Sequence, residues 1–363
     1  MSFHQSLITI TACLSFLLTG LMSQVAVAQS AVDNTFLTVE IMLPAIVGDP
    51  VEAQRWGKVF EKLGQVARIR QPLPGDKPDI KETNRGPIRT LRVVGELDRK
   101  GVLHFPGRSF TKNDTEQIKA WLKELRVYGA QGSPDGKKFW GLNQTQFETV
   151  VKGVSKPLEI DSVGKSLKEV LDDIPIDKTL PVVIHPSVKE SFFEIEMVKV
   201  TQQLQGLSSG TSLAVMLRTQ GYGFRPLRTP AGTIELTIEK LESTSEAWPV
   251  GWDIDDSKPR NQIVPNLFKF IKTGFEAAPL SRVLSAISEQ TRTPILIDER
   301  LCKEKDIDID SVDVSYPEKQ TAWSLVLGSV VRQARLTDKI RLDEAGKPFV
   351  WVAPFVPYVP KVK

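Results

Sequence analysis

The chain has 363 residues, and its 47 basic and 44 acidic side chains leave a formal net charge of +3. This near balance, with no long tail of a single sign, argues against a protein dedicated to binding nucleic acid or another polyanion. The length is sufficient for two or three hydrophobic cores, each the size of a small domain.

The N-terminal 28 residues have the features of a secretory signal peptide. An uncharged, mostly apolar stretch begins at Leu7, and small residues stand at Ala26 and Ala28, which predicts cleavage after Ala28. At about 16 residues the stretch is shorter than the ~20 of a membrane-spanning helix. Because no Lys or Arg precedes Leu7, a retained N-terminal anchor is one alternative. Lipidation at Cys13, within an imperfect lipobox, is another.

The composition of the mature chain narrows its chemistry. It keeps one cysteine, Cys302, so no intramolecular disulfide can form, and we expect this thiol to be structural. Its two histidines, His104 and His185, have no metal-binding spacing, and we expect neither a metal site nor a cofactor. No later stretch is apolar and long enough to cross a bilayer. The sequence therefore predicts a soluble protein of the periplasm or the extracellular medium.

An N-terminal α+β domain is expected over residues 33–152. Alternating and helically spaced apolar residues, with Gly and Pro at the boundaries, predict its elements. A second helix is expected to start from a cap at Thr111 or Asn113 and to end near Gly129. In chain order the expected elements are a strand at 36–43, a helix at 50–63, a strand at 66–70, a loop at 71–86, a hairpin at 88–97 and 102–105, the capped helix, and a short helix at 146–151.

The rest of the chain contains two similar segments, which we call the first module (155–242) and the second module (262–355). An offset of 113 positions superimposes Leu167 on Leu280 and continues without a gap through the strand that follows. Each module is expected to run strand, helix, strand, strand, helix, strand, with the helices on one face of a small sheet. The expected elements include strands at 193–197 and 307–314, and helices at 212–219 and 321–333.

The strings PLSRVLSAISEQTRTPILID (279–298) and SVDVSYPEKQTAWSLVLGSVV (311–331) resemble the short N-terminal domain of outer-membrane secretins and TonB-dependent receptors. SLKEVLDDIPIDKTLPVVI (166–184) resembles it more weakly. The resemblance implies a non-catalytic α+β module for interaction or assembly in the periplasm. The large barrel or multimerising domain that normally follows is absent from this sequence.

Three motifs invite a catalytic or ligand-binding interpretation, and each also has a simpler one. Residues 206–210 match the G-x-S-x-G nucleophile elbow, but the polar stretch before them predicts a helix entry instead. Residues 164–166 resemble the end of a phosphate-binding loop, but Glu159 stands where a glycine is needed, which favours a helix cap. Alternate aspartates faintly resemble a calcium loop that lacks its glycine, so we expect the acidic face of a half-buried strand. These aspartates are Asp306, Asp308, Asp310 and Asp313.

Arginines interleaved with aromatic residues form the most suggestive surface feature of the N-terminal domain. Guanidinium groups beside aromatic rings can bind an acidic partner or an anionic glycan through paired hydrogen bonds and stacking. The candidate binding residues are Arg68, Arg70, Arg89, Arg92, Arg108 and Trp140. The alternative is that these arginines form the solvated side of half-buried strands.

No catalytic constellation emerges from the sequence. We therefore expect a non-catalytic envelope protein whose modules bind another protein, and neither its oligomeric state nor its partner follows from the sequence. Two alternatives stay open: a secreted hydrolase that uses a carboxylate pair, and a binder of anionic polymers through the N-terminal domain. Residues 356–363, with Pro357 and Pro360, are expected to form an extended tail.

Overall fold

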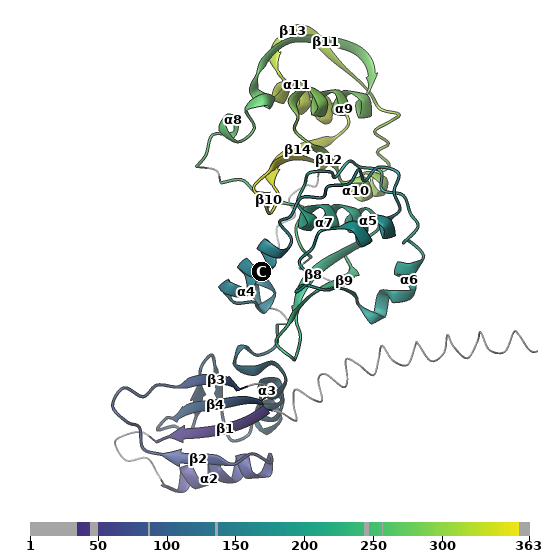
Figure 1. The fold of residues 1–363 in the computed structure, drawn as a ribbon. Helices are drawn as coiled ribbons and strands as arrows, with labels where there is room; N and C mark the ends of the chain where they lie inside the picture. The colour runs from purple at the N-terminus through teal and green to yellow at the C-terminus, as the bar shows by residue number, and fades with distance from the viewer. Residues whose placement is uncertain are drawn as a thin grey trace, which may run out of the picture. The chain divides into compact units, whose positions relative to one another are not determined.

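The computed structural model describes residues 35–43, 50–85, 88–134, 137–242, 247–255 and 257–355 (Figure 1). The predicted signal peptide and the predicted tail lie outside these ranges. Contacts divide the chain into unit 1, Met1–Gly141 with Arg228–Thr233, and unit 2, Leu142–Leu227 with Ile234–Lys363. Both units combine helices and strands, which confirms the α+β class.

Unit 1 is built on a six-stranded sheet in which β1 is parallel to both of its neighbours. The path through the sheet is β2-β1-β4-β5-β6, and β3 pairs with β4. The strands are β1 (Thr35–Met42), β2 (Ala67–Arg70), β3 (Asp79–Arg85), β4 (Ile88–Leu97), β5 (Leu103–Phe105) and β6 (Arg108–Phe110). The helices are α2 (Pro50–Lys62) and α3 (Thr115–Tyr128), followed by the 3-10 turns η1 (Gly129–Gln131) and η2 (Lys138–Gly141).

Alternation along the strands determines which face of this sheet becomes the core. Val39 and Ile41 of β1 point to one face, where Trp56 of α2 and Trp121 of α3 pack against them in one cluster. Glu40 lies between these two apolar positions and therefore points to the opposite face. Both helices thus cover one side of the sheet and leave the other side to polar residues.

Two predictions for this domain are wrong. The expected loop at 71–86 contains strand β3, which pairs with β4 through backbone hydrogen bonds. Its sequence, DIKETNR, is polar and mostly exposed, so it lacks the apolar alternation by which strands are recognised. The residue before α3 is Asp114 rather than Thr111 or Asn113, and its carboxylate accepts hydrogen bonds from Thr111 instead of capping the helix.

In unit 2, α4 (Gln144–Gly153) precedes the first module. That module contains helices α5 (Leu167–Asp173), α6 (Lys189–Phe193) and α7 (Ser209–Thr219) and the 3-10 turn η3 (Pro186–Val188). Its sheet has the order β7-β9-β8, with β7 (Val182–Ile184) at one edge. The other strands are β8 (Tyr222–Arg228) and β9 (Ile234–Lys240).

The second module is a three-layer arrangement. Helices α9 (Leu280–Thr291) and α11 (Trp323–Gln333) lie between the ribbon of β11 (Phe270–Pro279) and β13 (Asp313–Ala322) and a four-stranded sheet (Figure 1). The sheet has the order β10-β14-β15-β12. Its strands are β12 (Ile295–Ile297), β14 (Leu336–Leu342), β15 (Pro348–Pro354) and, from the segment before the module, β10 (Trp252–Asp253). Helix α8 (Arg260–Ile263) leads into the module, and the remaining elements are η4 (Pro265–Phe268) and α10 (Glu299–Glu304).

Strand pairing follows the same numbering offset in both modules. Val182 pairs with Leu236 in the first sheet and Ile295 pairs with Val350 in the second, so the partners are shifted by 113 and 114 positions. The isolated bridge between Ser166 and Lys199 corresponds in the same way to the pairing of Pro279 with Asp313. The first module therefore has an isolated bridge at the position where the second has a full ribbon.

The strands predicted at 193–197 and for most of 307–314 are also wrong. Phe193 ends helix α6 and turns follow it, whereas residues 306–312 form turns before β13 begins at Asp313. The isoleucines at 307 and 309 are half-buried and the aspartates beside them are exposed, as expected, but a chain of tight turns produces that alternation. The helices predicted at 212–219 and 321–333 begin instead at Ser209 and Trp323.

Candidate functional site

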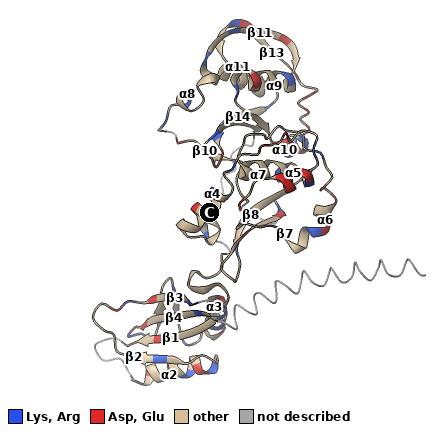
Figure 2. Cartoon of the chain, in the orientation of Figure 1, with Lys and Arg blue, Asp and Glu red and all other residues tan. Residues whose placement is uncertain are grey.

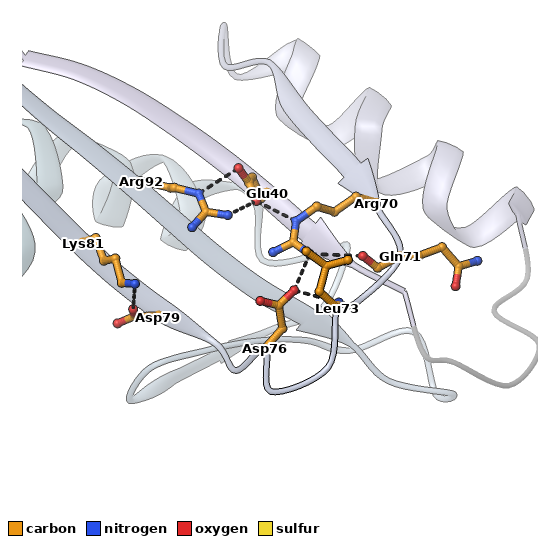
Figure 3. A network of polar contacts seen from close by, with 8 residues as sticks. All are labelled: Glu40, Arg70, Gln71, Leu73, Asp76, Asp79, Lys81 and Arg92. Carbon is orange, nitrogen blue, oxygen red and sulfur yellow. Dashed lines mark hydrogen bonds and ion pairs between the residues drawn. The ribbon is translucent and has the colours of Figure 1, made fainter.

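Glu40 organises the arginines on the polar face of the unit 1 sheet (Figure 3). Arg92 donates Nε–H to Oε1 at 2.9 Å and Nη2–H to Oε2 at 2.7 Å, and Arg70 donates Nε–H to Oε2 at 2.7 Å. Arg70 also donates to the Asp76 carboxylate at 2.5 Å. Two guanidinium groups and two carboxylates therefore form a network without net charge.

The electrostatics of Glu40 follow from these contacts. Hydrogen bonds from Arg92, and then from Arg70, lower the pKa of Glu40 from 4.5 to about 2, although burial opposes them. Glu40 as a whole residue is only 6% exposed. A buried charge of this kind is held by its partners, so the role of the network is structural.

The remaining candidate residues of unit 1 are also largely engaged. Arg89 donates to the carbonyl oxygens of Val127 and Pro230, and Arg108 pairs with Glu124 at 2.8 Å. Trp140 is buried. The structure does not gather the candidates into one open basic face, and acidic and basic residues are mixed over unit 1 (Figure 2).

Arg68 is exposed on β2, and within the described residues it forms no ion pair. Arg92 and Arg108 keep side chains that are each 45% exposed although they are paired. An anionic ligand could therefore reach Arg68 directly, but would have to compete with Glu40 for Arg92 and with Glu124 for Arg108. The binding prediction for unit 1 stays a prediction.

Unit 2 contains a different candidate site, a pocket of about 1080 Å³ on one side of the second module. Its walls are helix α9, strand β12, the turns at 306–310, and segment 201–205 of the first module. We call it the α9–β12 groove. It exceeds the roughly 300–1,000 Å³ of a typical small-molecule pocket, which favours an extended ligand.

Strand β12 contributes a free sheet edge to this groove. Pro294 and Asp298, which flank the strand, hydrogen-bond to β15 at 2.8 Å, so the backbone groups of Ile295 and Ile297 point to the opposite side. Among the described residues no strand pairs with β12 on that side. An edge of this kind is a template for pairing with another chain.

A side chain of the first module occupies part of this edge. Gln202 accepts a hydrogen bond from the Ile297 N–H at 2.7 Å through Oε1, and its Nε2 donates to the Ile297 carbonyl at 2.9 Å. The carboxamide thus satisfies the same donor and acceptor that a neighbouring strand would satisfy. Because Ile295 lies two residues earlier, its N–H and C=O face the same groove.

The helical wall of the groove has small side chains. Ser281, Ser285 and Ser288 line it at helical spacing, together with Leu284. The matching positions in the first module are Lys168, Asp172 and Pro175, with Leu171 in place of Leu284. The second module therefore has smaller side chains at these positions than the first module does.

The remaining wall is acidic. Exposed Asp306, Asp308 and Asp310 line the groove, and within the described part of the chain no ion pair joins them to a cation. Glu299 accepts hydrogen bonds from the Thr201 hydroxyl at 2.7 and 2.8 Å, and burial raises the pKa of its carboxyl group. With Arg292 and Lys303 as the basic members, carboxylates outnumber cations along the groove.

Cys302 also borders the groove but is buried, as expected for a structural cysteine. Burial, and then the nearby carboxylates of Asp298 and Glu299, raise the pKa of this thiol to about 11. A thiol with such a pKa is protonated at neutral pH and is a poor nucleophile. Lys303 and Lys305, which follow Cys302 in the sequence, do not lower the pKa of its thiol.

The G-x-S-x-G motif is a helix entry, as predicted. Ser208 precedes α7, and its hydroxyl donates to the carboxylate of Glu344. The same carboxylate accepts hydrogen bonds from the Thr211 N–H at 3.0 Å and from Trp248 Nε1 at 2.6 Å. A Cβ at Gly210 would lie 2.8 Å from this carboxyl group, so the glycine permits the approach. Glu344 therefore joins the two modules within unit 2.

The other motifs have structural roles. Ser166 and Glu169 form a reciprocal capping box at the start of α5, so the Gly-Lys-Ser sequence is a helix cap, as predicted. In the described residues no group of three His, Cys, Asp or Glu side chains is placed to hold a metal ion. Over the same residues, no helix has both the length and the apolar character needed to cross a membrane.

Comparison with known proteins found no matching family model and no match among curated proteins or solved structures. The geometry of the described residues is therefore the basis for proposing a function. Sequence reasoning missed the groove, although serines at positions 281, 285 and 288 gave one available signal. The free edge and the Gln202 contact depend on the tertiary fold and leave no pattern in the sequence.

Proposed function

We propose that the protein is an exported, non-catalytic interaction protein, and that its second module binds a partner protein in the α9–β12 groove. The observation that carries the proposal is the groove itself: a sheet edge without a neighbouring strand, beside a helix with small side chains. Edges of this kind support peptide recognition, because the main chain supplies affinity and the side-chain subsites supply specificity.

The two modules are proposed to be copies of one unit that resembles the short N-terminal domain of secretins and TonB-dependent receptors. The corresponding strand registers and the corresponding bridge support this relationship. In the proposed duplication the first module is the supporting copy. Its α7 holds Glu344 of the second module, and its Gln202 reaches the β12 edge.

Site-specific photo-crosslinking in the producing cells tests the function. A photoreactive phenylalanine analogue replaces Ser285, which is exposed and lines the groove, and the control carries it at Gln290, which is exposed on the same helix outside the groove. We expect a discrete crosslinked adduct from position 285 and none from position 290. Identical adduct patterns, or no adduct at position 285, would contradict the proposal.

A further inference from the structure

Building on the proposed function, we infer that the partner inserts an extended, basic peptide segment into the groove and adds it as a strand to β12. The proposal further identifies Gln202 as an internal placeholder that the incoming strand displaces. Three features of the groove support it: the hydrogen-bonding groups of the edge, the space beside them and the charge around them.

The hydrogen-bonding groups favour a main-chain ligand. Ile295 and Ile297 present two N–H and two C=O groups to the groove. These are the groups to which an added strand would hydrogen-bond. Gln202 satisfies only the pair on Ile297, at 2.7 and 2.9 Å. A side-chain carboxamide has the same kinds of donor and acceptor as a peptide bond. A ligand strand can therefore replace the Gln202 carboxamide, with its own C=O accepting from the Ile297 N–H and its own N–H donating to the Ile297 carbonyl.

The space beside the edge suits an extended chain. Successive side chains of an added strand point to opposite faces of the sheet, and α9 covers one of those faces. The side chains on that face would lie against Leu284 and the serines at 281, 285 and 288. This wall accepts medium-sized apolar side chains at every second position of the ligand.

The charge around the edge selects basic side chains. Asp306, Asp308 and Asp310 form no ion pair among the described residues, and Glu299 adds a fourth carboxyl group to the groove. Arg292 and Lys303 offset only part of this charge. Lysine or arginine at the alternate positions of the ligand would complement the excess, whereas acidic residues there would be repelled.

Binding of three kinds of synthetic nine-residue peptide to the purified full chain tests the inference. One peptide alternates Lys with Val, the second alternates Glu with Val, and the third kind is the Lys–Val peptide N-methylated on alternate residues, prepared in both registers. Affinity is measured by fluorescence anisotropy up to 1 mM peptide. Amide hydrogen exchange of Ile295 and Ile297 is measured with and without peptide.

We expect the Lys–Val peptide to bind and to protect both amides, with at least ten-fold weaker binding of the Glu–Val peptide and of one N-methylated register. Gln202→Ala frees the Ile297 groups, so its affinity for the Lys–Val peptide should rise about ten-fold. Gln290→Ala, on the exposed side of α9, is the matched control and should bind as the unmodified chain does. Equal thermal unfolding midpoints for the two variants establish that folding is not the cause.

Each of the other results overturns a defined part of the inference. Equal binding of the Glu–Val peptide removes the charge argument, and equal binding of both N-methylated registers removes strand addition. Weaker binding by Gln202→Ala makes Gln202 a ligand contact rather than a placeholder. If no peptide binds although Ser285 crosslinks a partner, the strand inference is wrong and the proposed function stands. If the Lys–Val peptide binds but Ser285 crosslinks nothing, the proposed function fails.

Discussion

The Glu40 network gives a quantitative prediction for unit 1. Replacing Glu40 with Gln keeps the size of the side chain and removes the charge that Arg70 and Arg92 share. Lowering the pKa of the carboxyl group from 4.5 to about 2 corresponds to about 3 kcal/mol of stabilisation of the folded state at neutral pH. We therefore expect Glu40→Gln to reduce the free energy of unfolding of unit 1 by about this amount at pH 7.

The pH dependence follows from the direction of the shift. Because the pKa of Glu40 is lower in the folded chain, its stabilisation is fully present above about pH 4.5 and is lost as the pH falls towards 2. The difference between the unmodified chain and Glu40→Gln should therefore stay constant from pH 7 to about pH 5. It should shrink towards zero below that, because both chains then carry a neutral group.

Native-state hydrogen exchange of amides in β1 and β4 measures this difference in the full chain and separates unit 1 from unit 2. Glu61→Gln is a matched control, because Glu61 is exposed on α2 and its change should be within about 0.5 kcal/mol. A Glu40→Gln effect as small as that of the control, or one that does not vary with pH between 5 and 2, would refute the electrostatic reasoning.

Three further predictions concern unit 2 and export. Glu344→Gln should lower the free energy of unfolding of unit 2 by about 1–3 kcal/mol, because a charged hydrogen-bond acceptor is lost at the module junction. Urea titrations followed by Trp248 fluorescence measure this, and an unchanged unfolding midpoint would exclude the role of Glu344 at the junction. Gly274→Ala should open the β11–β13 ribbon, since its Cβ would lie 2.4 Å from the Glu318 Cα, and unchanged exchange protection of the ribbon would contradict this. Mass spectrometry of the exported protein should find an N-terminus directly after Ala28, and Ala28→Arg should block processing; a full-length exported chain would favour the retained anchor.

Strong periodicity made several elements predictable. Apolar residues at helical spacing located α2 and α3. The gapless offset of 113 positions from Leu167 to Leu280 covered α5 and α9 together with the strands that follow them, β7 and β12. The helix cap at 164–166 was predicted because Glu159 stands where a phosphate-binding loop needs a glycine, and the structure adds Glu169 as the reciprocal partner of Ser166. In each case the local sequence already contains the interactions that define the element.

Other features could not be predicted because their cause lies outside the local sequence. Strand β3 is polar and is held by backbone pairing to β4. The acidic alternation at 306–312 looks like a strand, but Asp306 adopts a φ of 53°, a left-handed conformation that interrupts an extended chain. In the same way, Gln202 is an ordinary polar residue in sequence and meets Ile297 only through tertiary folding.

The prediction that arginines of unit 1 bind an anion has the same limitation. The arginines at 70 and 92 were identified as candidates for binding an anion, but Glu40 between them is the decisive residue. The parallel register of β1 with β2 and β4 brings the three side chains together. A sequence reveals which strands carry charge, whereas the ion pairs depend on which strands become neighbours.

The central claim, that the α9–β12 groove binds a partner protein, is tested most directly by quantitative partner recovery from cells. Ser285→Trp places a bulky side chain in the groove, and Gln290→Trp places the same side chain on the exposed face of α9 outside it. We predict that Ser285→Trp loses the crosslinked partner while Gln290→Trp recovers it at the level of the unmodified chain. Equal recovery by both variants would contradict the claim.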